Sequence, residues 1–566
     1  MRHHRLVIAA ALAASTALIP VTGAVATDAT AATSQQENDT GGEYVVAFES
    51  ANQEQALQAI SDAGGVVMDV LAPVGLALVS ADAGFATAVE ADASVTGAFQ
   101  DVSIGATREG MAQVRATDRL TVVEAGAAAA RAAQRRDTRT EPLESLQWDM
   151  AMIGATLDGA HKTATGKQVT VGIMDTGVDA SHPDIAPNFN WKLSHNFTHD
   201  RPDVDGPCDT PTCVDPFWVD EGGHGTHVAG IVGAARNNIG ITGVAPDVSI
   251  VNIRAGQDSG YFFFFETVAA LLYAGDKGLD VVNMSFYTDP WLYNCASDAD
   301  YVSGVRTPEQ IAEQAMIRQG LLAAVTYAHE RGVTLVAAAG NGHTNLAAPT
   351  REDLTSPDYP PGTNTARVVA KSCLDLPSEA PEVISVSSVG PSGTKSDFSN
   401  YGLGDVEVSA PGGWFRDWIG TPNYRLNSNQ VLSSYPYELA IEEGRLDANG
   451  VPLLPDTYSA CDGRGNCGAW VYLQGTSMAS PHVAGEAALV VQAHGSRARG
   501  GYSLDPDTVR QIIETTATDH ACPAGGVEIY TDEGRPPDFN AVCEGTTADN
   551  GLYGEGIINA TAAVAH

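Results

Sequence analysis

The hydrophobic pattern of residues 43–104 predicts a small domain of mixed strands and helices. A period of two over residues 43–48 places Tyr44, Val46 and Phe48 on one face of a strand. The pattern then predicts, in chain order, a helix over 53–63, strands over 66–70 and 75–79, a short helix over 85–91 and a strand over 94–99. This order of elements is that of the split βαβ, ferredoxin-like fold.

Residues 105–141 lack a core-forming pattern. Between residues 125 and 136 the chain is mostly alanine with arginines, and it ends in Arg135-Arg136. We expect an exposed linker that proteases reach easily. A solvated helix is the alternative, and it would leave the segment equally open to cleavage.

From residue 142 onward the pattern becomes one of short apolar segments separated by helical stretches. The apolar segments predict strands over 169–174, 249–254, 280–284, 333–339, 383–389 and 406–410. Apolar strands without alternation, separated by helices, predict an α/β fold with a mostly parallel central sheet covered on both faces. Two polar insertions interrupt the pattern, the first over residues 199–222 and the second over 414–470.

The first 26 residues have the features of a secretory signal peptide. Arg2 and Arg5 form a basic start, residues 6–18 are an apolar run, and Ala24-Val25-Ala26 fits the small-residue rule for cleavage. A buried helix is the alternative reading. No later segment has enough consecutive apolar residues to span a bilayer, so we expect a secreted, extracellular protein without a membrane anchor.

Composition narrows the possible partners. The 566-residue chain is 44% hydrophobic and 18% charged, which is ordinary for a globular protein, and its net charge of −38 argues against nucleic acid as a partner. Eight cysteines in a secreted chain suggest disulfides. Three pairs are close in sequence, Cys208/Cys213, Cys461/Cys467 and Cys522/Cys543, and they leave Cys295 and Cys373. The sequence alone permits about 100 pairings. The absence of any CxxC pair disfavours a metal cluster.

Three motifs carry the residue types needed for nucleophilic catalysis. Asp175 ends the strand predicted over 169–174, where functional groups gather in parallel sheets. His224 opens a helix of small residues, and Ser477 lies at the start of a helix, where free backbone N–H groups favour negative charge. A serine becomes a nucleophile when a base takes its proton and an acid orients that base.

Each motif also has a plainer reading. Asp175 alone fits an acidic turn, and Ser477 alone fits a helix cap. His224 and His227 lie one helical turn apart, as metal ligands do, but the sequence lacks the Glu of an HExxH motif. Pro481 is expected in the first turn of its helix, where a missing N–H costs little.

The complete strings resemble the subtilases, the subtilisin-like serine peptidases. They are Asp175-Thr-Gly-Val-Asp-Ala-Ser-His-Pro-Asp184, His224-Gly-Thr-His227 and Gly475-Thr-Ser-Met-Ala-Ser-Pro-His482, and the resemblance covers roughly residues 146–518. It implies that Ser477 attacks the peptide carbonyl, that His224 is the general base and then the general acid, and that Asp175 orients and stabilises the imidazolium.

The same resemblance assigns the substrate-binding segments. Ala337-Ala338-Ala339-Gly340-Asn341 is similar to the oxyanion-hole segment, so the Asn341 amide would donate to the oxyanion. In the family, the backbone of segments matching Ser285 to Tyr287 and Ala338 to Gly340 forms the two sides of the primary specificity pocket. The family usually continues with Leu-Gly after the serine, whereas this chain has Phe286 and Tyr287. A tyrosine in place of glycine would narrow or cover that pocket.

The resemblance implies no cofactor for the chemistry, but it suggests a structural calcium. Asp184 and Asn237 match positions that hold calcium in many family members, and carboxylate and amide oxygens suit this hard cation. A solvated aspartate and a turn asparagine are the alternative.

Residues 27–104 resemble the inhibitory propeptides of secreted subtilases. They would act as an intramolecular inhibitor and chaperone of the catalytic domain, residues 142–566. Self-cleavage is expected between residues 130 and 145, and a cut by another protease at Arg135-Arg136 is the rival.

The leading hypothesis is a secreted, monomeric serine endopeptidase, made as a zymogen, that acts on proteins or peptides through an acyl-enzyme. A narrow-specificity processing peptidase and an inactive binding homologue are the alternatives.

Overall fold

The computed structural model describes residues 41–101, 140–202, 205–208, 210–303, 307–349, 368–498 and 501–566. The predicted signal peptide and nearly all of the predicted linker lie outside these residues. Within the described part of the chain, no helix combines the length and apolar character that a bilayer crossing requires.

Residues 41–101, the N-terminal module, form a four-stranded antiparallel sheet with two helices. The elements are β1 (Gly42–Phe48), α1 (Gln53–Asp62), β2 (Val66–Leu71), β3 (Leu76–Ala81), α2 (Phe85–Val89) and β4 (Val95–Gln100). The strand order β2-β3-β1-β4 confirms the predicted ferredoxin-like fold. Tyr44, Val46 and Phe48 share one buried cluster with both helices, as the period of two predicts.

The central sheet of the remaining chain has seven strands in the order β13-β12-β10-β8-β5-β7-β6, and every pairing in it is parallel. Its strands are β5 (Thr170–Met174), β6 (His195–Asn196), β7 (Ser249–Arg254), β8 (Val281–Met284), β10 (Thr334–Ala338), β12 (Val383–Val389) and β13 (Val408–Pro411). All six predicted strands are present, which confirms the α/β prediction. The sequence missed β6, because two residues are too few to show a pattern.

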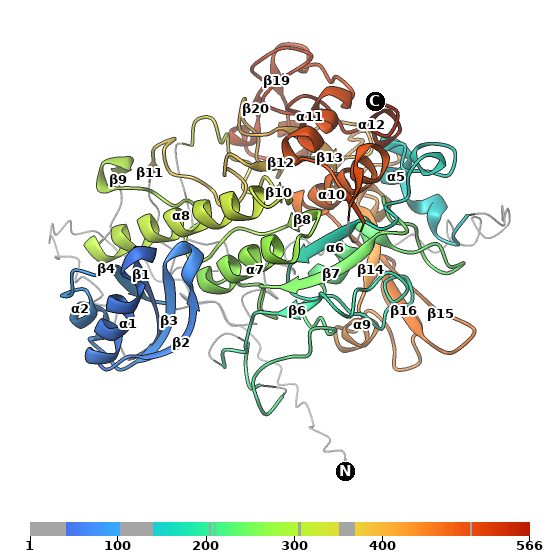
Figure 1. Cartoon of the computed structure of the whole chain (residues 1–566). Coiled ribbons are helices and arrows are strands. Elements are labelled where there is room, and N and C mark those ends of the chain that lie inside the picture. Colours follow the sequence, from blue (N-terminus) through green and yellow to red (C-terminus); the bar gives the residue numbers. More distant parts are fainter. Residues whose placement is uncertain are drawn as a thin grey trace, which may run out of the picture. The chain divides into compact units, whose positions relative to one another are not determined.

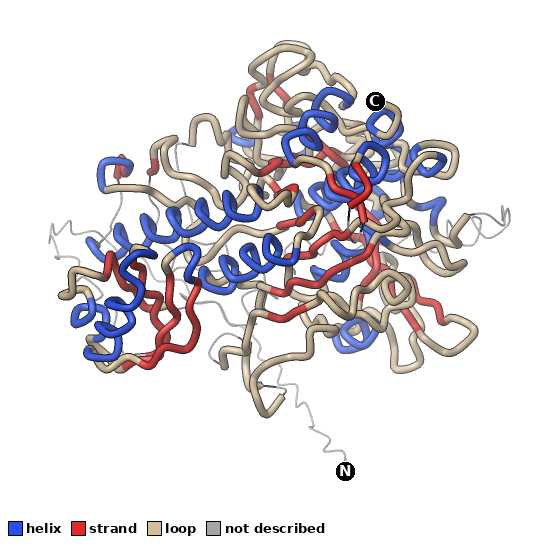
Figure 2. Tube along the Cα trace, in the orientation of Figure 1, coloured by secondary structure: helices blue, strands red, loops and turns tan. Residues whose placement is uncertain are grey.

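Helices cover both faces of this sheet (Figures 1 and 2). On one face lie α6 (His224–Gly233), α10 (Thr476–His494) and α11 (Pro506–Thr516), and on the other α7 (Phe264–Lys277) and α8 (Pro308–His329). Side chains of β5 alternate between the two layers: Val171 and Ile173 join the α6 and α10 core, and Met174 joins the α7 and α8 core. Three further α-helices in the described part of this region are short: α5 (Trp148–Ile153), α9 (Tyr437–Glu442) and α12 (Ala560–Ala563).

The second face of the N-terminal sheet packs on α7 and α8 (Figure 1). Val45, Leu76 and Leu78 belong to the same buried cluster as Phe264 and Leu321 of these helices. This face alternates with the one that carries Tyr44 and Val46, so β1 is buried on both sides.

The second insertion builds an antiparallel sheet that the sequence did not predict. Its strands are β14 (Val431–Tyr435), β15 (Thr457–Cys461) and β16 (Cys467–Leu473), in the order β14-β16-β15. β14 packs along α6, and the Ser433 hydroxyl donates to the His227 carbonyl at 2.7 Å. Among the described residues there are also three two-stranded ribbons: β9 (Tyr301–Ser303) with β11 (Val368–Val369), β17 (Ser496–Ala498) with β18 (Gly501–Ser503), and β19 (Val527–Glu528) with β20 (Ala541–Val542).

Four disulfides use all eight cysteines. They join Cys208 to Cys213, Cys295 to Cys373, Cys461 to Cys467 and Cys522 to Cys543. The three pairings suggested by closeness in sequence are confirmed, and so is the fourth that they leave.

Candidate active site

The carboxyl ends of three neighbouring strands bring the candidate residues to one edge of the sheet. Strands β5, β8 and β10 are adjacent and parallel, and Met174 is in register with Met284, which is in register with Ala337. The residues that follow, Asp175 after β5 and Ser285 after β8, therefore lie side by side at the edge where α/β proteins bind ligands.

Asp175 and His224 are joined by a hydrogen bond. Nδ1 of His224 lies 2.8 Å from Oδ1 of Asp175, and the Thr176 backbone N–H donates to the same oxygen at 2.8 Å. Asp175 is fully buried, whereas the His224 ring is 29% exposed. Because the carboxylate accepts from Nδ1, the neutral imidazole has its lone pair on Nε2, the atom that a general base needs.

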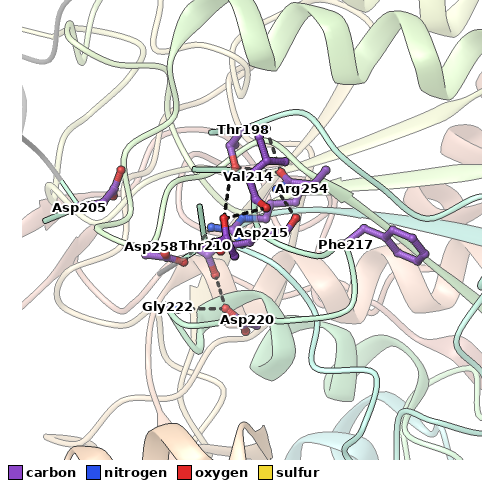
Figure 3. A network of polar contacts seen from close by, with 12 residues as sticks. Thr198, Asp205, Thr210, Val214, Asp215, Phe217, Asp220, Gly222, Arg254 and Asp258 are labelled. Carbon is purple, nitrogen blue, oxygen red and sulfur yellow. Dashed lines mark hydrogen bonds and ion pairs between the residues drawn. The ribbon is translucent and has the colours of Figure 1, made fainter. Parts of the chain in front are cut away.

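Asp220 fixes the backbone around this pair. Its Oδ1 accepts from the N–H groups of Gly222 and Gly223 and from the Thr176 hydroxyl at 2.8–3.1 Å. Its Oδ2 accepts from the Thr226 N–H and hydroxyl at 2.9 and 2.6 Å. Figure 3 shows the bond from Gly222. Burial raises the pKa of Asp220, and these hydrogen bonds offset only part of the rise. One carboxylate thus joins the loop before His224 to the strand end that carries Asp175.

Ser477 is the second residue of α10. This helix packs against α6, so Ser477 and His224 lie at the starts of two helices in contact. The half-buried Ser477 donates its hydroxyl hydrogen to the Ser285 carbonyl at 3.3 Å. Backbone N–H groups in this first turn lack helical acceptors and favour developing negative charge.

The prediction that Pro481 lies in the first turn of its helix is wrong. α10 begins at Thr476, so Pro481 is inside the helix and cannot donate to the Ser477 carbonyl, four residues earlier. The Ser285 hydroxyl takes over this role and donates to Ser477 O at 3.0 Å. Asn283 Nδ2 donates to the Ser285 hydroxyl, and Ser480 Oγ lies 2.8 Å from it, so Ser285 is held in place.

Thr476 orients the side chain of Asn341. Both the backbone N–H and the hydroxyl of Thr476 donate to Asn341 Oδ1 at 2.9 Å, and the Gly340 N–H donates to the same hydroxyl at 3.1 Å. With its oxygen engaged in this way, the exposed Asn341 presents its NH₂ group elsewhere. The predicted oxyanion donor thus lies beside the first turn of α10.

The residues that depart from the family pattern have distinct environments. Phe286 stacks on Phe262 with ring centroids 3.9 Å apart and planes 4° apart, and Tyr287 is half-buried beyond it. On the opposite segment, Ala338 and Ala339 are buried. Gly340 has φ +98°, and a Cβ there would meet Asn400 Nδ2 at 2.5 Å, so this position requires glycine.

The candidate calcium ligand Asp184 is fully buried and has a partner that the sequence did not suggest. Its Oδ2 accepts from Trp470 Nε1 at 2.8 Å and from the Ile241 N–H at 3.1 Å, but Oδ1 has no hydrogen bond. Glu141, also buried, has an unbonded Oε2. Burial raises the pKa of Asp184 to about 8 and that of Glu141 to about 7, and the charge of Glu141 adds to the shift at Asp184. Buried carboxylates with free oxygens fit a hard divalent cation.

Asn237, the other candidate ligand, already has hydrogen bonds within its loop. Its Oδ1 accepts from the Ile239 N–H at 3.0 Å, and its Nδ2 donates to the Pro183 carbonyl at 2.8 Å. An amide oxygen retains a second lone pair, so Asn237 remains compatible with a ligand role.

A second acidic group lies beside a buried arginine. Carboxylate oxygens of Asp200, Asp215 and Asp258 lie within 4.8 Å of one another. The fully buried Arg254 pairs with Asp215 at 3.0 Å and with Asp258 at 2.8 Å (Figure 3). This arrangement is a buried ion-pair network, in which the guanidinium supplies the positive charge.

Several residues in or near the candidate site could not be assigned from the sequence. Asp220 lies close to the His224 motif, but nothing in the sequence shows that it is buried. Glu141 is the last residue of the predicted linker, where an exposed position was expected, but it too is buried. Ser285 was assigned to the pocket through its backbone, and its hydroxyl has a further contact with the first turn of α10. His227 is fully buried, and its Nε2 lies 3.1 Å from the Val471 carbonyl.

Comparisons with known proteins identify relatives of this chain. Thermitase of Thermoactinomyces vulgaris is 28% identical over 386 residues, which cover 68% of this chain and 91% of thermitase. Subtilisin DY of Bacillus licheniformis is 28% identical over 357 residues, covering 62% and 85%. Among solved structures, an epidermin leader peptide processing serine protease from Staphylococcus aureus has a TM-score of 0.59 at 18% identity, covering 93% of this chain and 98% of that one.

A model of the subtilase family matches residues 166–530, well over half of the chain. This range contains Asp175, His224, Asn341 and Ser477, and the structural match shows the same fold. The chain therefore belongs to the subtilase family, the subtilisin-like serine peptidases.

Proposed function

We propose that this chain is a secreted serine endopeptidase that hydrolyses peptide bonds through Asp175, His224 and Ser477. The observation that carries the proposal is the 2.8 Å bond from His224 Nδ1 to the buried Asp175 at the sheet edge. It fixes the tautomer in which Nε2 accepts a proton.

In the proposed mechanism, His224 Nε2 removes the proton of Ser477 Oγ as this oxygen attacks the peptide carbonyl carbon. The Ser477 hydroxyl first turns from the Ser285 carbonyl toward the imidazole. The oxyanion accepts from Asn341 Nδ2 and from the Ser477 N–H. His224 then protonates the leaving amine, and the acyl-enzyme is hydrolysed by a water that His224 activates in the same way.

The N-terminal module acts in this proposal as inhibitor and folding aid. Its close packing on α7 and α8 supports a stable complex. Glu141 is buried, and its N–H donates to Glu144 Oε2 at 2.8 Å. Because the chain is already anchored at this residue, a cut before it is favoured. Cleavage is therefore expected within the linker, either by the chain itself or by another protease at Arg135-Arg136.

Calcium is proposed as a structural ion only. Asp184 and Glu141 would hold it, with Asn237 nearby, and its charge would stabilise two buried carboxylates. No step of peptide hydrolysis requires it.

The proposed function also implies a cellular compartment and a class of partners. Four disulfides support an oxidising environment and therefore secretion after removal of residues 1–26. Protein or peptide substrates, a monomeric state and no nucleic-acid partner remain our expectations.

The substrate range is the second question. The main alternative to a broad-specificity peptidase is a narrow-specificity processing peptidase. Phe286 and Tyr287, which replace the family's Leu-Gly, support this alternative. A peptide-library cleavage profile separates them, because a processing enzyme cuts few sequences and a broad one cuts many.

The proposal is tested by covalent labelling with a fluorophosphonate. The wild-type chain should label, Ser477→Ala should not, and Ser459→Ala, a serine in β15 of the second insertion, should label as the wild type does. Failure of the wild-type chain to label would instead support the inactive binding homologue. Maturation is scored on the same samples: Ser477→Ala, purified alone, should stay full length if cleavage is autocatalytic.

A further inference from the structure

An arginine of the first insertion contacts the N-terminal module through buried ion pairs. Arg201 Nη2 lies 3.2 Å from Glu43 Oε2 and 3.2 Å from Asp101 Oδ2, and Nη1 donates to the Asp101 carbonyl at 2.7 Å. Both acids belong to the module, Glu43 to β1 and Asp101 to the position after β4. On the catalytic side, Glu266 of α7 accepts from the same Nη2 at 3.3 Å.

These ion pairs are energetically important because the Arg201 side chain is buried. Its side chain is only 9% exposed, and its guanidinium lies 3.6 Å from the centroid of the Phe263 ring. Exposed ion pairs contribute little, but removing one partner of a buried pair leaves an uncompensated charge. Loss of the module would remove two of the carboxylates that Arg201 contacts.

The charges at the site do not balance without a further proton. Arg201 and His199 face Glu43, Asp101 and Glu266, and the backbone N–H of Arg201 donates to Asp205 at 2.9 Å. His199 Nε2 lies 3.2 Å from Glu43 Oε1. Three buried or half-buried carboxylates therefore share one guanidinium and one imidazole.

We propose that Arg201 and its neighbours form a docking site for the Glu43 and Asp101 carboxylates, which keeps the N-terminal module bound after the linker is cut and releases it as the pH rises. This inference rests on the proposed function, in which the module inhibits the enzyme. The apolar contacts with α7 and α8 provide affinity that does not depend on pH, so the pH dependence comes from the Arg201 site.

The direction of the pH dependence follows from two groups. Burial raises the pKa of Asp101 to about 7, and the charges of Glu266 and Glu43 add to this. The hydrogen bond to Glu43 raises the pKa of His199. Both groups hold a proton in the docked state that they lose more readily when free, so docking weakens as the pH rises through neutrality.

The lowered pKa of Glu43 has the opposite effect, since it strengthens docking as the pH rises, but only in the acidic range. The bond from His199 and the charge of Arg201 lower its pKa although burial alone would raise it. For Asp101 alone, the docking constant should fall about tenfold between pH 6 and pH 8.5.

The test uses the full-length Ser477→Ala chain, cut by brief trypsin treatment in the arginine-containing linker and analysed by size exclusion. The module should remain with the catalytic domain at pH 6 and separate at pH 8.5. Arg201→Gln should separate already at pH 6. Asp101→Asn, which needs no proton, should stay docked at pH 8.5. Arg464→Gln, an exposed arginine in the turn before β16, is the matched control.

The outcomes separate this inference from the proposed function. Retention that is equal at both pH values, or an Asp101→Asn chain that separates as the parent does, overturns the inference even if the wild-type chain matures and labels. If Arg201→Gln fails to fold, the Asp101→Asn comparison still decides. A wild-type chain that neither matures nor labels overturns the proposed function, whatever the docking result.

Discussion

Ser285 and Ser477 exchange two hydrogen bonds. The Ser285 hydroxyl donates to the Ser477 carbonyl at 3.0 Å, and the Ser477 hydroxyl donates to the Ser285 carbonyl at 3.3 Å. The exchange joins the carboxyl end of β8 to the first turn of α10. The segment expected to contact substrate is thereby coupled to the position of Ser477, the proposed nucleophile.

Replacing Ser285 by alanine should lower kcat while leaving the fold intact. The Ser477 carbonyl would lose the donor that compensates for Pro481, at about 1 kcal/mol, and the first turn of α10 would shift. We expect kcat to fall about fivefold for a loss of this size in the transition state. Steady-state kinetics and thermal unfolding of the same preparation measure the two effects.

Ser480→Ala is the control for this prediction. It removes the hydroxyl that lies 2.8 Å from Ser285 Oγ but leaves the bond to the Ser477 carbonyl. A kcat that falls equally in both variants would argue against a specific role for the Ser285 donor.

Asp220→Asn should reduce activity through the position of His224. An amide has one acceptor oxygen, so the donors from Thr226 or those from Gly222, Gly223 and Thr176 would face an NH₂ group. We expect about 2–3 kcal/mol of destabilisation. A displaced imidazole lowers kcat/KM by about 100-fold. Both effects are measurable by kinetics and chemical denaturation.

Asp462→Asn provides the comparison, because Asp462 also accepts backbone N–H groups but does so in an exposed turn. It should leave kcat/KM unchanged. If Asp220→Asn retains wild-type kinetics at temperatures where it is folded, the carboxylate has no role in positioning His224.

Asp220 and Pro481 show where prediction from the sequence fails, whereas the strands and the motifs show where it succeeds. The strands were predictable because uninterrupted apolar segments are local, and the motifs around Asp175, His224 and Ser477 were predictable because each is a contiguous string. Asp220 could not be assigned from the sequence, because Thr176, whose hydroxyl donates a hydrogen bond to it, lies 44 residues away in the chain. Pro481 was misplaced because the start of α10 is set by the tertiary bonds of Thr476 to Asn341.

Glu486→Gln should stabilise the protein at neutral and alkaline pH. Glu486 is fully buried in α10, and burial raises its pKa from 4.5 to about 8, with the Asn559 backbone N–H offsetting part of the rise. Between pH 4.5 and about pH 8 the folded state thus binds more protons than the unfolded state. Stability is therefore full below the unfolded pKa and is lost as the pH rises toward the folded pKa, at up to about 1.4 kcal/mol per pH unit.

Denaturant unfolding at pH 5 and pH 8 measures this effect. The difference in unfolding free energy between the two pH values should be smaller in Glu486→Gln than in the wild-type chain. Glu438→Gln, in the first turn of α9, should change nothing. An unchanged pH difference in Glu486→Gln would show that other groups carry the pH dependence.

Removal of calcium should lower the thermal stability through Asp184 and Glu141. A cation bound only by the folded state stabilises it by mass action, and its loss to a chelator should lower Tm by roughly 5 °C. In Asp184→Asn and Glu141→Gln the chelator should have little further effect, because the amides bind the ion weakly. Asp447→Asn, in an exposed turn, should respond to the chelator as the wild type does. Because each variant is compared with and without chelator, its own change in stability cancels, and an equal drop in every chain would place the ion elsewhere.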